Sequence, residues 1–177
     1  MRVLVTGISG FVGPRLAGHL EAGGATVAGT YVGPRPDLPS VDLVEVDLSE
    51  IETLRRLIAD SGAERIVHLA ALSHVGASWS RIGEYFQVNV LGTENLMRAA
   101  DGLPVLLASS AEVYGAVPDH EQPISEDRPL LPASPYAMSK AAAERLALEH
   151  GATVVRMFNL AGPGQAPGFA LPGFAAQ

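Results

Sequence analysis

Short apolar runs alternate with segments of helical periodicity along most of this chain. Apolar runs bounded by polar or glycine-rich positions are typical of buried strands, and apolar residues three or four positions apart indicate one face of a helix. Leu54 and Ile58 share such a face. The pattern predicts strands at 2–5, 26–30, 43–46, 65–69, 105–108 and 153–156. It predicts helices at 10–22, 51–61, 81–100 and 135–150.

Strands and helices that alternate in this way are typical of a parallel sheet covered on both faces. We therefore predict an α/β fold with a doubly wound parallel sheet, in one domain that occupies residues 1–177. Two proline-rich segments, 33–39 and 117–135, interrupt the pattern and are predicted to be loops.

Glycine recurs every third residue at Gly7, Gly10 and Gly13, directly after the first predicted strand. Glycines at such a turn let the backbone approach a ligand pyrophosphate, which then lies at the positive end of the following helix. A strand before the glycines and a helix after them are the context that this motif requires. The motif predicts a Rossmann-like dinucleotide site, with a ligand-free glycine-rich turn as the alternative.

Tyr136 and Lys140 lie four residues apart, and therefore on one face of a predicted helix. A nearby ammonium lowers the pKa of a phenol, which would suit Tyr136 to proton transfer near neutral pH. Ser109, Ser110 and Glu112 follow the fifth strand, at the sheet edge where ligands bind in open α/β folds. A Ser110 hydroxyl there can bond a substrate oxygen. Glu112 is a substrate contact, a base or a turn carboxylate that accepts from a backbone N–H. A tyrosine packed on a lysine stem and a serine-rich turn remain the structural alternatives.

Composition excludes several classes of function. The 177 residues carry a net charge of −7 and no cysteine, so disulfides, thiolate metal sites and a cysteine nucleophile are impossible. An acidic chain argues against non-specific nucleic-acid binding, and the histidines lack metal-ligand spacing. No apolar run approaches the ~18 residues that span a bilayer. Since the glycine motif begins too early to follow a leader segment, we expect a cytoplasmic protein with no membrane partner.

Taken together and in order, the segments 6–13, 68–71, 89–93, 109–115, 136–140 and 158–163 resemble the extended short-chain dehydrogenase/reductases, the NAD-dependent epimerase/dehydratase family. The resemblance covers the whole chain and implies action on a nucleotide sugar. Segments 118–140, 158–159 and 162–165, with Phe169 and 174–177, are most similar to the members that reduce the 4-keto group of GDP-4-keto-6-deoxy-D-mannose to give GDP-D-rhamnose.

The resemblance also implies roles for individual residues. Ser110, Tyr136 and Lys140 are expected to be catalytic, with Glu112 as a further candidate. Substrate contacts are expected at Ser73, Ser110, Asn159 and Gln165. Cofactor contacts are expected at Gly7, Gly10, Phe11, Val12, Gly13, Thr30, Arg35, Asp47, Leu48, Leu69, Ala70, Ala71, Ser109, Tyr136 and Lys140.

The choice of cofactor rests on the residues after the second strand. A site that prefers NAD often has an acidic residue there to bind the ribose 2′-hydroxyl. Here the strand ends at Thr30, no carboxylate follows until Asp37, and Arg35 lies nearby. Arg35 is either a partner for a 2′-phosphate or a solvated loop residue. We predict NADP(H), with NAD(H) also accepted.

Three functions remain open from the sequence. The first is a nucleotide-sugar 4-keto reductase. The second is a 4,6-dehydratase of the GDP-mannose type or a 4-epimerase, either of which recycles its NAD(P). The third is a non-catalytic dinucleotide-binding fragment, because family members continue into a substrate domain to which 158–177 is the expected lead-in. We also expect a homodimer formed through the predicted helices at 81–100 and 135–150, with contacts at Leu91, Leu96, Ala141, Ala142 and Leu146.

Overall fold

A computed structural model describes residues 1–166 of the chain. Phe169 and the rest of the segment 167–177, which belong to the expected lead-in, lie outside the described residues. The strands form one sheet in the order β3-β2-β1-β4-β5-β6, and every neighbouring pair is parallel. Their bounds are β1 (Arg2–Thr6), β2 (Thr26–Tyr31), β3 (Asp42–Glu45), β4 (Arg65–His68), β5 (Val105–Ser110) and β6 (Thr153–Met157). The predicted Rossmann-like fold is confirmed.

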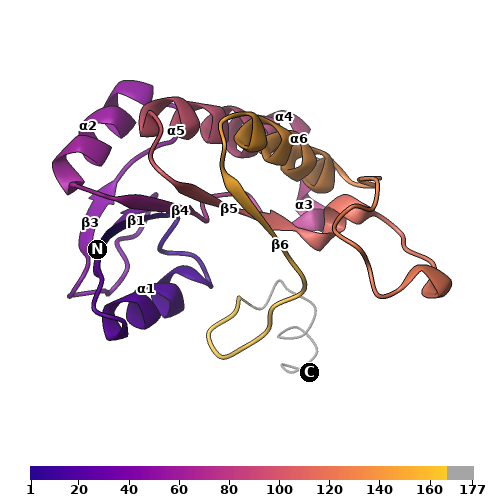
Figure 1. Cartoon of the computed structure of the whole chain (residues 1–177), viewed down its shortest axis with the longest axis horizontal. Helices are drawn as coiled ribbons and strands as arrows, with labels where there is room; N and C mark the ends of the chain where they lie inside the picture. Colours follow the sequence, from indigo (N-terminus) through magenta and orange to yellow (C-terminus); the bar gives the residue numbers. More distant parts are fainter. Residues whose placement is uncertain (167–177) are drawn as a thin grey trace.

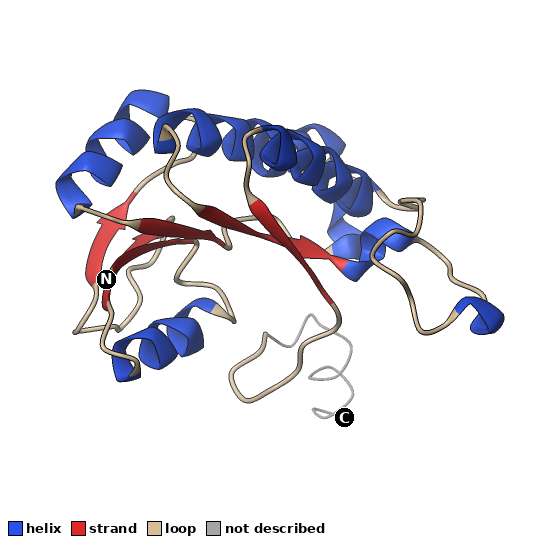
Figure 2. Ribbon diagram, in the orientation of Figure 1, coloured by secondary structure: helices blue, strands red, loops and turns tan. Residues whose placement is uncertain are grey.

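Helices cover both faces of the sheet (Figure 1). α1 (Gly13–Ala22) lies on one face, and α2 (Ile51–Ser61), α4 (Ile82–Phe86), α5 (Gly92–Ala100) and α6 (Pro135–Glu149) lie on the other. The short elements are α3 (Val75–Ser78), the π-helix η1 (Gln87–Leu91), and the 3-10 helices η2 (Ala111–Tyr114) and η3 (Asp119–Glu121). Figure 2 shows that long loops connect the elements around η2 and η3 and follow β6. Because strand order reverses between β1 and β4, their carboxyl ends border a crevice.

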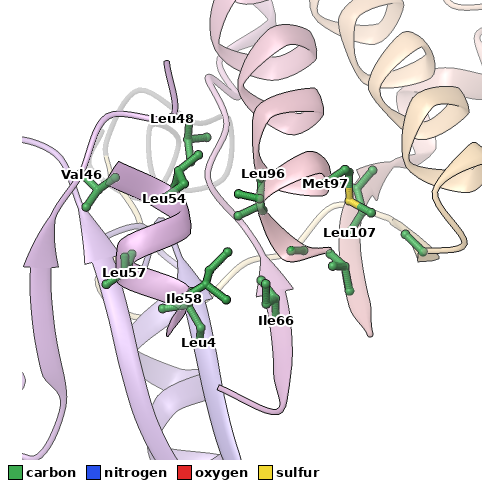
Figure 3. Close-up of a cluster of buried hydrophobic side chains, with 14 of the residues drawn as sticks. Leu4, Val46, Leu48, Leu54, Leu57, Ile58, Ile66, Leu96, Met97 and Leu107 are labelled. Atoms are coloured by element: carbon green, nitrogen blue, oxygen red, sulfur yellow. The ribbon is translucent and has the colours of Figure 1, made fainter. Parts of the chain in front are cut away.

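The alternation of side chains along β1 separates the two cores. Val3 and Val5 pack in the cluster beneath α1 together with Ile8. Leu4 points to the opposite face, into the larger cluster that includes Leu54 of α2 (Figure 3). Period-two alternation in a strand produces this division, and burial of apolar surface stabilises both layers.

The predicted helix 81–100 is the main difference from the sequence analysis. It is divided into α4, the π-helical turn η1 and α5. A π turn inserts one extra residue in a helix, and such turns are often found at functional sites. Here the turn contains Asn89, whose buried side chain bonds to the backbone of Leu72 rather than facing the sheet core. The predicted helix 10–22 also begins later, at Gly13, because residues 9–12 belong to the turn.

Leu96 is not available for a contact between subunits, so that part of the sequence prediction is wrong. Its side chain has 0% exposure and packs in the core between α5 and the sheet. Leu91, five residues earlier, is 51% exposed. Ala141, Ala142 and Leu146 on α6 are partly exposed.

Two glycines of α1 give a matched test of the turn. A Cβ on Gly13 would lie 2.1 Å from the Ile8 carbonyl oxygen, whereas a Cβ on Gly18 would meet nothing within 4 Å. We expect Gly13→Ala to lower the free energy of unfolding by about 1–3 kcal/mol or more through overpacking. Gly18→Ala should raise it by roughly 0.5–1 kcal/mol, because alanine favours a helix over glycine. Denaturant unfolding measures both values, and equal effects of the two substitutions would contradict the crowding at Gly13.

Candidate active site

A cavity of about 1060 Å³ opens at the carboxyl ends of the strands. Its wall is built from the glycine turn after β1, the end of β2, the segments after β3 and β4, the end of β5 and the residues after β6. Cavities that bind small ligands are commonly ~300–1,000 Å³, so this one can hold an extended molecule. Most of the polar groups that the sequence analysis singled out therefore meet in one place.

The glycine turn has one position, Gly7, where the fold leaves no room for a side chain, and another, Gly10, where the backbone is less crowded. Gly7 has φ +68°, and a Cβ there would lie 2.6 Å from the Ala70 Cα. A Cβ on Gly10 would meet only the Gly7 carbonyl oxygen, at 3.3 Å. Gly10 therefore presents bare backbone to the cavity, which suits the close approach of a pyrophosphate at the start of α1.

The expected cofactor residues lie together, with two exceptions. The cavity is lined by Gly7, Gly10, Phe11, Val12, Gly13, Thr30, Asp47, Leu48, Leu69, Ala70, Ala71, Ser109 and Tyr136. Arg35 and Lys140 are not part of this wall. Arg35 is exposed in the loop after β2, and Lys140 is buried behind the wall. These two contacts stay predictions.

The four expected substrate residues, Ser73, Ser110, Asn159 and Gln165, all line the cavity. The Gln165 side chain donates to the Leu160 carbonyl at 3.1 Å, while its Oε1 is a buried acceptor with no partner among the described residues. A buried acceptor left unpaired is costly. The open backbone at Gly10 and the free acceptor at Gln165 both fit a bound polar ligand such as a dinucleotide.

Tyr136 is held at the start of α6, where Ser134 caps the helix by accepting the Ala137 N–H at 3.1 Å. The phenol ring packs edge-on against Tyr85, with ring centroids 6.4 Å apart. Burial raises the pKa of Tyr136 above its ordinary value, and a hydrogen bond with Ser110 opposes that shift. The phenol therefore remains protonated at neutral pH and can donate a proton.

The expected effect of Lys140 on the Tyr136 pKa is wrong for this structure. The Lys140 ammonium donates to the Ala108 carbonyl at 2.5 Å, and the charges that act on Tyr136 come from Glu112 and Tyr85. Burial lowers the pKa of Lys140 itself to about 8. Helical spacing correctly placed Tyr136 and Lys140 on one face of α6. The Lys140 ammonium, however, is hydrogen-bonded to the backbone carbonyl of Ala108 on β5.

Glu112 lies in the cavity wall beside Ser110. Its backbone N–H donates to the Ser110 Oγ at 3.2 Å, which caps η2. The carboxylate thus comes from the same turn as the serine hydroxyl. This placement is compatible with each of the roles that the sequence left open for Glu112.

Asn89 joins the two sides of the site and was not predicted as a site residue. Its Nδ2 donates to the Leu72 carbonyl at 3.0 Å and to the Ser139 Oγ at 2.9 Å, and its Oδ1 accepts from the Leu72 N–H at 2.8 Å. Ser139 donates in turn to the Tyr136 carbonyl at 2.7 Å. Asn89 therefore ties the cavity segment after β4 to the helix that carries Tyr136. It lies within the motif 89–93, which could have pointed to it.

His68 is a buried neutral histidine. Thr93 Oγ1 donates to the Asn89 carbonyl at 2.6 Å, so its oxygen accepts from His68 Nε2 at 3.1 Å. His68 Nδ1 then accepts from Thr6 Oγ1 at 2.6 Å. Burial is the first cause that lowers the pKa of His68 to about 3, and the nearby Lys140 charge adds to it. No group of three or more potential metal ligands comes together within residues 1–166, nor is any helix there long and apolar enough to cross a membrane.

Comparisons with known proteins agree with this geometry. The model of the NAD dependent epimerase/dehydratase family matches residues 3–177. The chain is 37% identical to a dTDP-glucose 4,6-dehydratase of Streptomyces antibioticus and 36% identical to a GDP-6-deoxy-D-mannose reductase of Pseudomonas aeruginosa. These alignments cover 98% and 99% of this chain but 58% of each relative. The structure of Thermus thermophilus UDP-glucose 4-epimerase in complex with NAD superposes with a TM-score of 0.88 at 34% identity, over 99% of this chain and 60% of that one.

The neutral state of His68 should be visible in the stability of the chain. Because the folded pKa of about 3 lies below the ordinary 6.5, stability from this group is complete above pH 6.5 and is lost as pH falls toward 3. We expect wild type to lose up to ~1.4 kcal/mol more per pH unit below 6.5 than His68→Gln. Urea unfolding at pH 7, 6 and 5 measures this, with His19→Gln on exposed α1 surface as the control that behaves like wild type. An equal pH dependence in wild type and His68→Gln would contradict the assignment.

Proposed function

The chain belongs to the NAD dependent epimerase/dehydratase family, and we propose that it is the dinucleotide-binding and catalytic part of a nucleotide-sugar 4-keto reductase. The proposed substrate is GDP-4-keto-6-deoxy-D-mannose and the proposed product is GDP-D-rhamnose. The observation that carries the proposal is the buried phenol of Tyr136, which is kept protonated beside Ser110 in the cavity wall. The chain spans 58% of the two relatives in length, so the proposal concerns the part of the reaction that these residues perform.

In the proposed reaction, separate residues bind the cofactor, supply the proton and hold the substrate oxygen. The glycine turn, Asp47 and Leu48 would hold a nicotinamide dinucleotide, which would supply the hydride that reduces a carbonyl. Tyr136 gives its proton to the oxygen that becomes a hydroxyl, and Ser110 holds that oxygen by a hydrogen bond. Lys140 supports the end of β5 through the Ala108 carbonyl. We propose that its ammonium also contacts the cofactor ribose.

Ketone reduction consumes a proton, and the protonated phenol of Tyr136 beside Ser110 can supply it.

The dehydratase is nevertheless the second candidate, since Glu112 lines the cavity and a dTDP-glucose 4,6-dehydratase is a relative at 37% identity. Net oxidation of the dinucleotide distinguishes the two reactions. A reductase consumes one dinucleotide per sugar, whereas a dehydratase or an epimerase regenerates it.

We also propose a homodimer. Leu91 is half-exposed on η1, and Ala141, Ala142 and Leu146 are partly exposed on α6. Small and apolar residues on these neighbouring helices suit close packing against a second copy.

The cofactor preference can be tested by calorimetry on the chain itself. If Arg35 meets a 2′-phosphate, wild type binds NADP⁺ more tightly than NAD⁺, and Arg35→Ala weakens NADP⁺ binding about tenfold while leaving NAD⁺ binding unchanged. Arg55→Ala is the matched control, because Arg55 is an exposed arginine paired with Glu52 on α2. Tighter binding of NAD⁺ by wild type would assign the site to NAD(H) instead.

The proton donor can be tested in the full-length enzyme with GDP-4-keto-6-deoxy-D-mannose and NADPH. Tyr136→Phe keeps the ring but removes the proton, so turnover should fall by ~10²–10⁴-fold while dinucleotide binding survives. Tyr85→Phe, which removes a hydroxyl bonded to the His74 carbonyl, should retain most of its turnover. Near-normal turnover by Tyr136→Phe would show that the tyrosine is structural.

A further inference from the structure

A buried carboxylate lies one helical turn beyond Lys140, and neither the expected cavity contacts nor the proposed proton transfer uses it. Glu144 is 2% exposed and Lys140 is 4% exposed, and both project from α6. A buried charge is costly unless it is paired and hydrogen-bonded. The arrangement around Glu144 therefore needs a physical reason.

Glu144 and Lys140 attach α6 to consecutive residues of β5. Ser109 Oγ donates to Glu144 Oε2 at 2.9 Å, and Lys140 Nζ donates to the carbonyl of Ala108 at 2.5 Å. The next residue of β5 is Ser110, which lines the cavity. The two contacts thus fix the position of the carboxyl end of β5 relative to α6, the helix that carries Tyr136.

Arg156 of β6 holds the carboxylate in place. Its Nε donates to Glu144 Oε1 at 3.0 Å and to Oε2 at 3.2 Å, and its Nη2 also bonds Oε1. The other edge of the guanidinium donates to the Tyr114 hydroxyl at 2.8 Å and to the Glu126 carbonyl at 2.7 Å. Glu144 is consequently bound on one side to β5 and on the other to an arginine that is itself fixed.

We propose that Glu144 is a positioning residue, which Arg156 orients and which holds the Lys140 ammonium and the Ser110 end of β5 in their working arrangement. This inference rests on the proposed function, because it assigns Glu144 a role in that reaction. It adds a buried counter-charge to the expected group of Ser110, Tyr136 and Lys140.

The field of Glu144 has a measurable consequence. Burial lowers the pKa of Lys140 to about 8, and the Glu144 charge acts in the opposite direction. Without that charge, a larger fraction of Lys140 would be neutral at neutral pH. The other titratable or charged groups on elements packed around this part of α6 are His68, Tyr85, Glu112, Tyr114, Tyr136 and Arg156.

A purely structural ion pair makes a different prediction. A pair that only holds β6 against α6 would change the stability of the fold when it is broken, and any shift in the Lys140 titration would leave the pH dependence of turnover where it is. Measuring the titration together with turnover separates the two roles.

The chain offers an unusually direct measurement, because Lys140 is its only lysine. Lysine-selective ¹⁵N labelling gives a single side-chain Nζ resonance, whose pH midpoint we expect near 8 in the wild-type chain. In Glu144→Gln the midpoint should fall by about one unit or more, the effect of removing an opposite charge at close range. Glu144→Asp keeps the charge and should restore most of the shift. Glu149→Gln, on an exposed ion pair of the same helix, should leave the midpoint unchanged.

The double variant Glu144→Gln/Arg156→Gln covers the case in which the single variant fails to fold, because it removes both members of the Glu144–Arg156 ion pair and leaves no unpaired guanidinium. Its midpoint should also fall below that of wild type. In the full-length enzyme, the pH dependence of turnover should move in the same direction as the Nζ midpoint.

An unchanged Nζ midpoint in whichever of these variants folds would overturn the inference. So would a shifted midpoint without a matching shift in the turnover profile. A wild-type chain that binds no dinucleotide would instead overturn the proposed function, and it would do so whatever the titration of Lys140 shows.

Discussion

Crowding around Gly7 and Ile8 is the constraint on which the rest of the site depends. The backbone of Gly7 passes against Ala70, and the start of α1 at Gly13 passes against the Ile8 carbonyl. On the next strand, a Cβ on Gly29 would lie 2.6 Å from the Ile8 side chain, which fills the space that this glycine leaves. The fully buried Ile8 thus anchors the turn in the core beneath α1. Gly7, Gly13 and Gly29 let β1, β2 and the turn come this close. The open backbone at Gly10 follows from the same packing.

A series of buried hydrogen bonds connects the end of β1, next to the glycine turn, with α6 on the opposite side of the cavity. Thr6, at the end of β1, bonds His68, and His68 bonds Thr93 on α5. Thr93 and Asn89 continue the connection to α6 through the hydroxyl of Ser139. Each buried polar group in this series has a partner, so the series orders the interior without leaving an unpaired charge. A continuous series of hydrogen bonds therefore connects the end of β1 to the helix that carries Tyr136.

Sequence patterns predicted the helices and strands that depend on local periodicity. They missed the features that depend on contacts between residues far apart in the chain. Helix 51–61 agrees with the structure at both ends, because its apolar face and the glycine that follows it are local features. The break at 87–91 was missed, since residue spacing cannot reveal an i→i+5 turn stabilised by a backbone contact with Leu72. Glu144 and Glu149 are equivalent as letters on one helix. Only the fold shows that the first faces Ser109 and Arg156 while the second faces solvent with Arg145. For the same reason, helical spacing placed Lys140 on the same face as Tyr136 but could not show that its ammonium bonds the Ala108 carbonyl on β5.

The π-helical turn has a consequence for how this segment tolerates changes in length. A π turn holds one extra residue within nearly the same rotation as an α-helical turn, so removing one residue from 87–91 would restore a regular α-helix and leave α5 in phase with α4. Leu96 would then still face the core. A deletion would instead change the turn that presents Asn89 to Leu72 and Ser139. The extra residue therefore matters for the wall of the cavity, and the packing of α5 on the sheet does not depend on it.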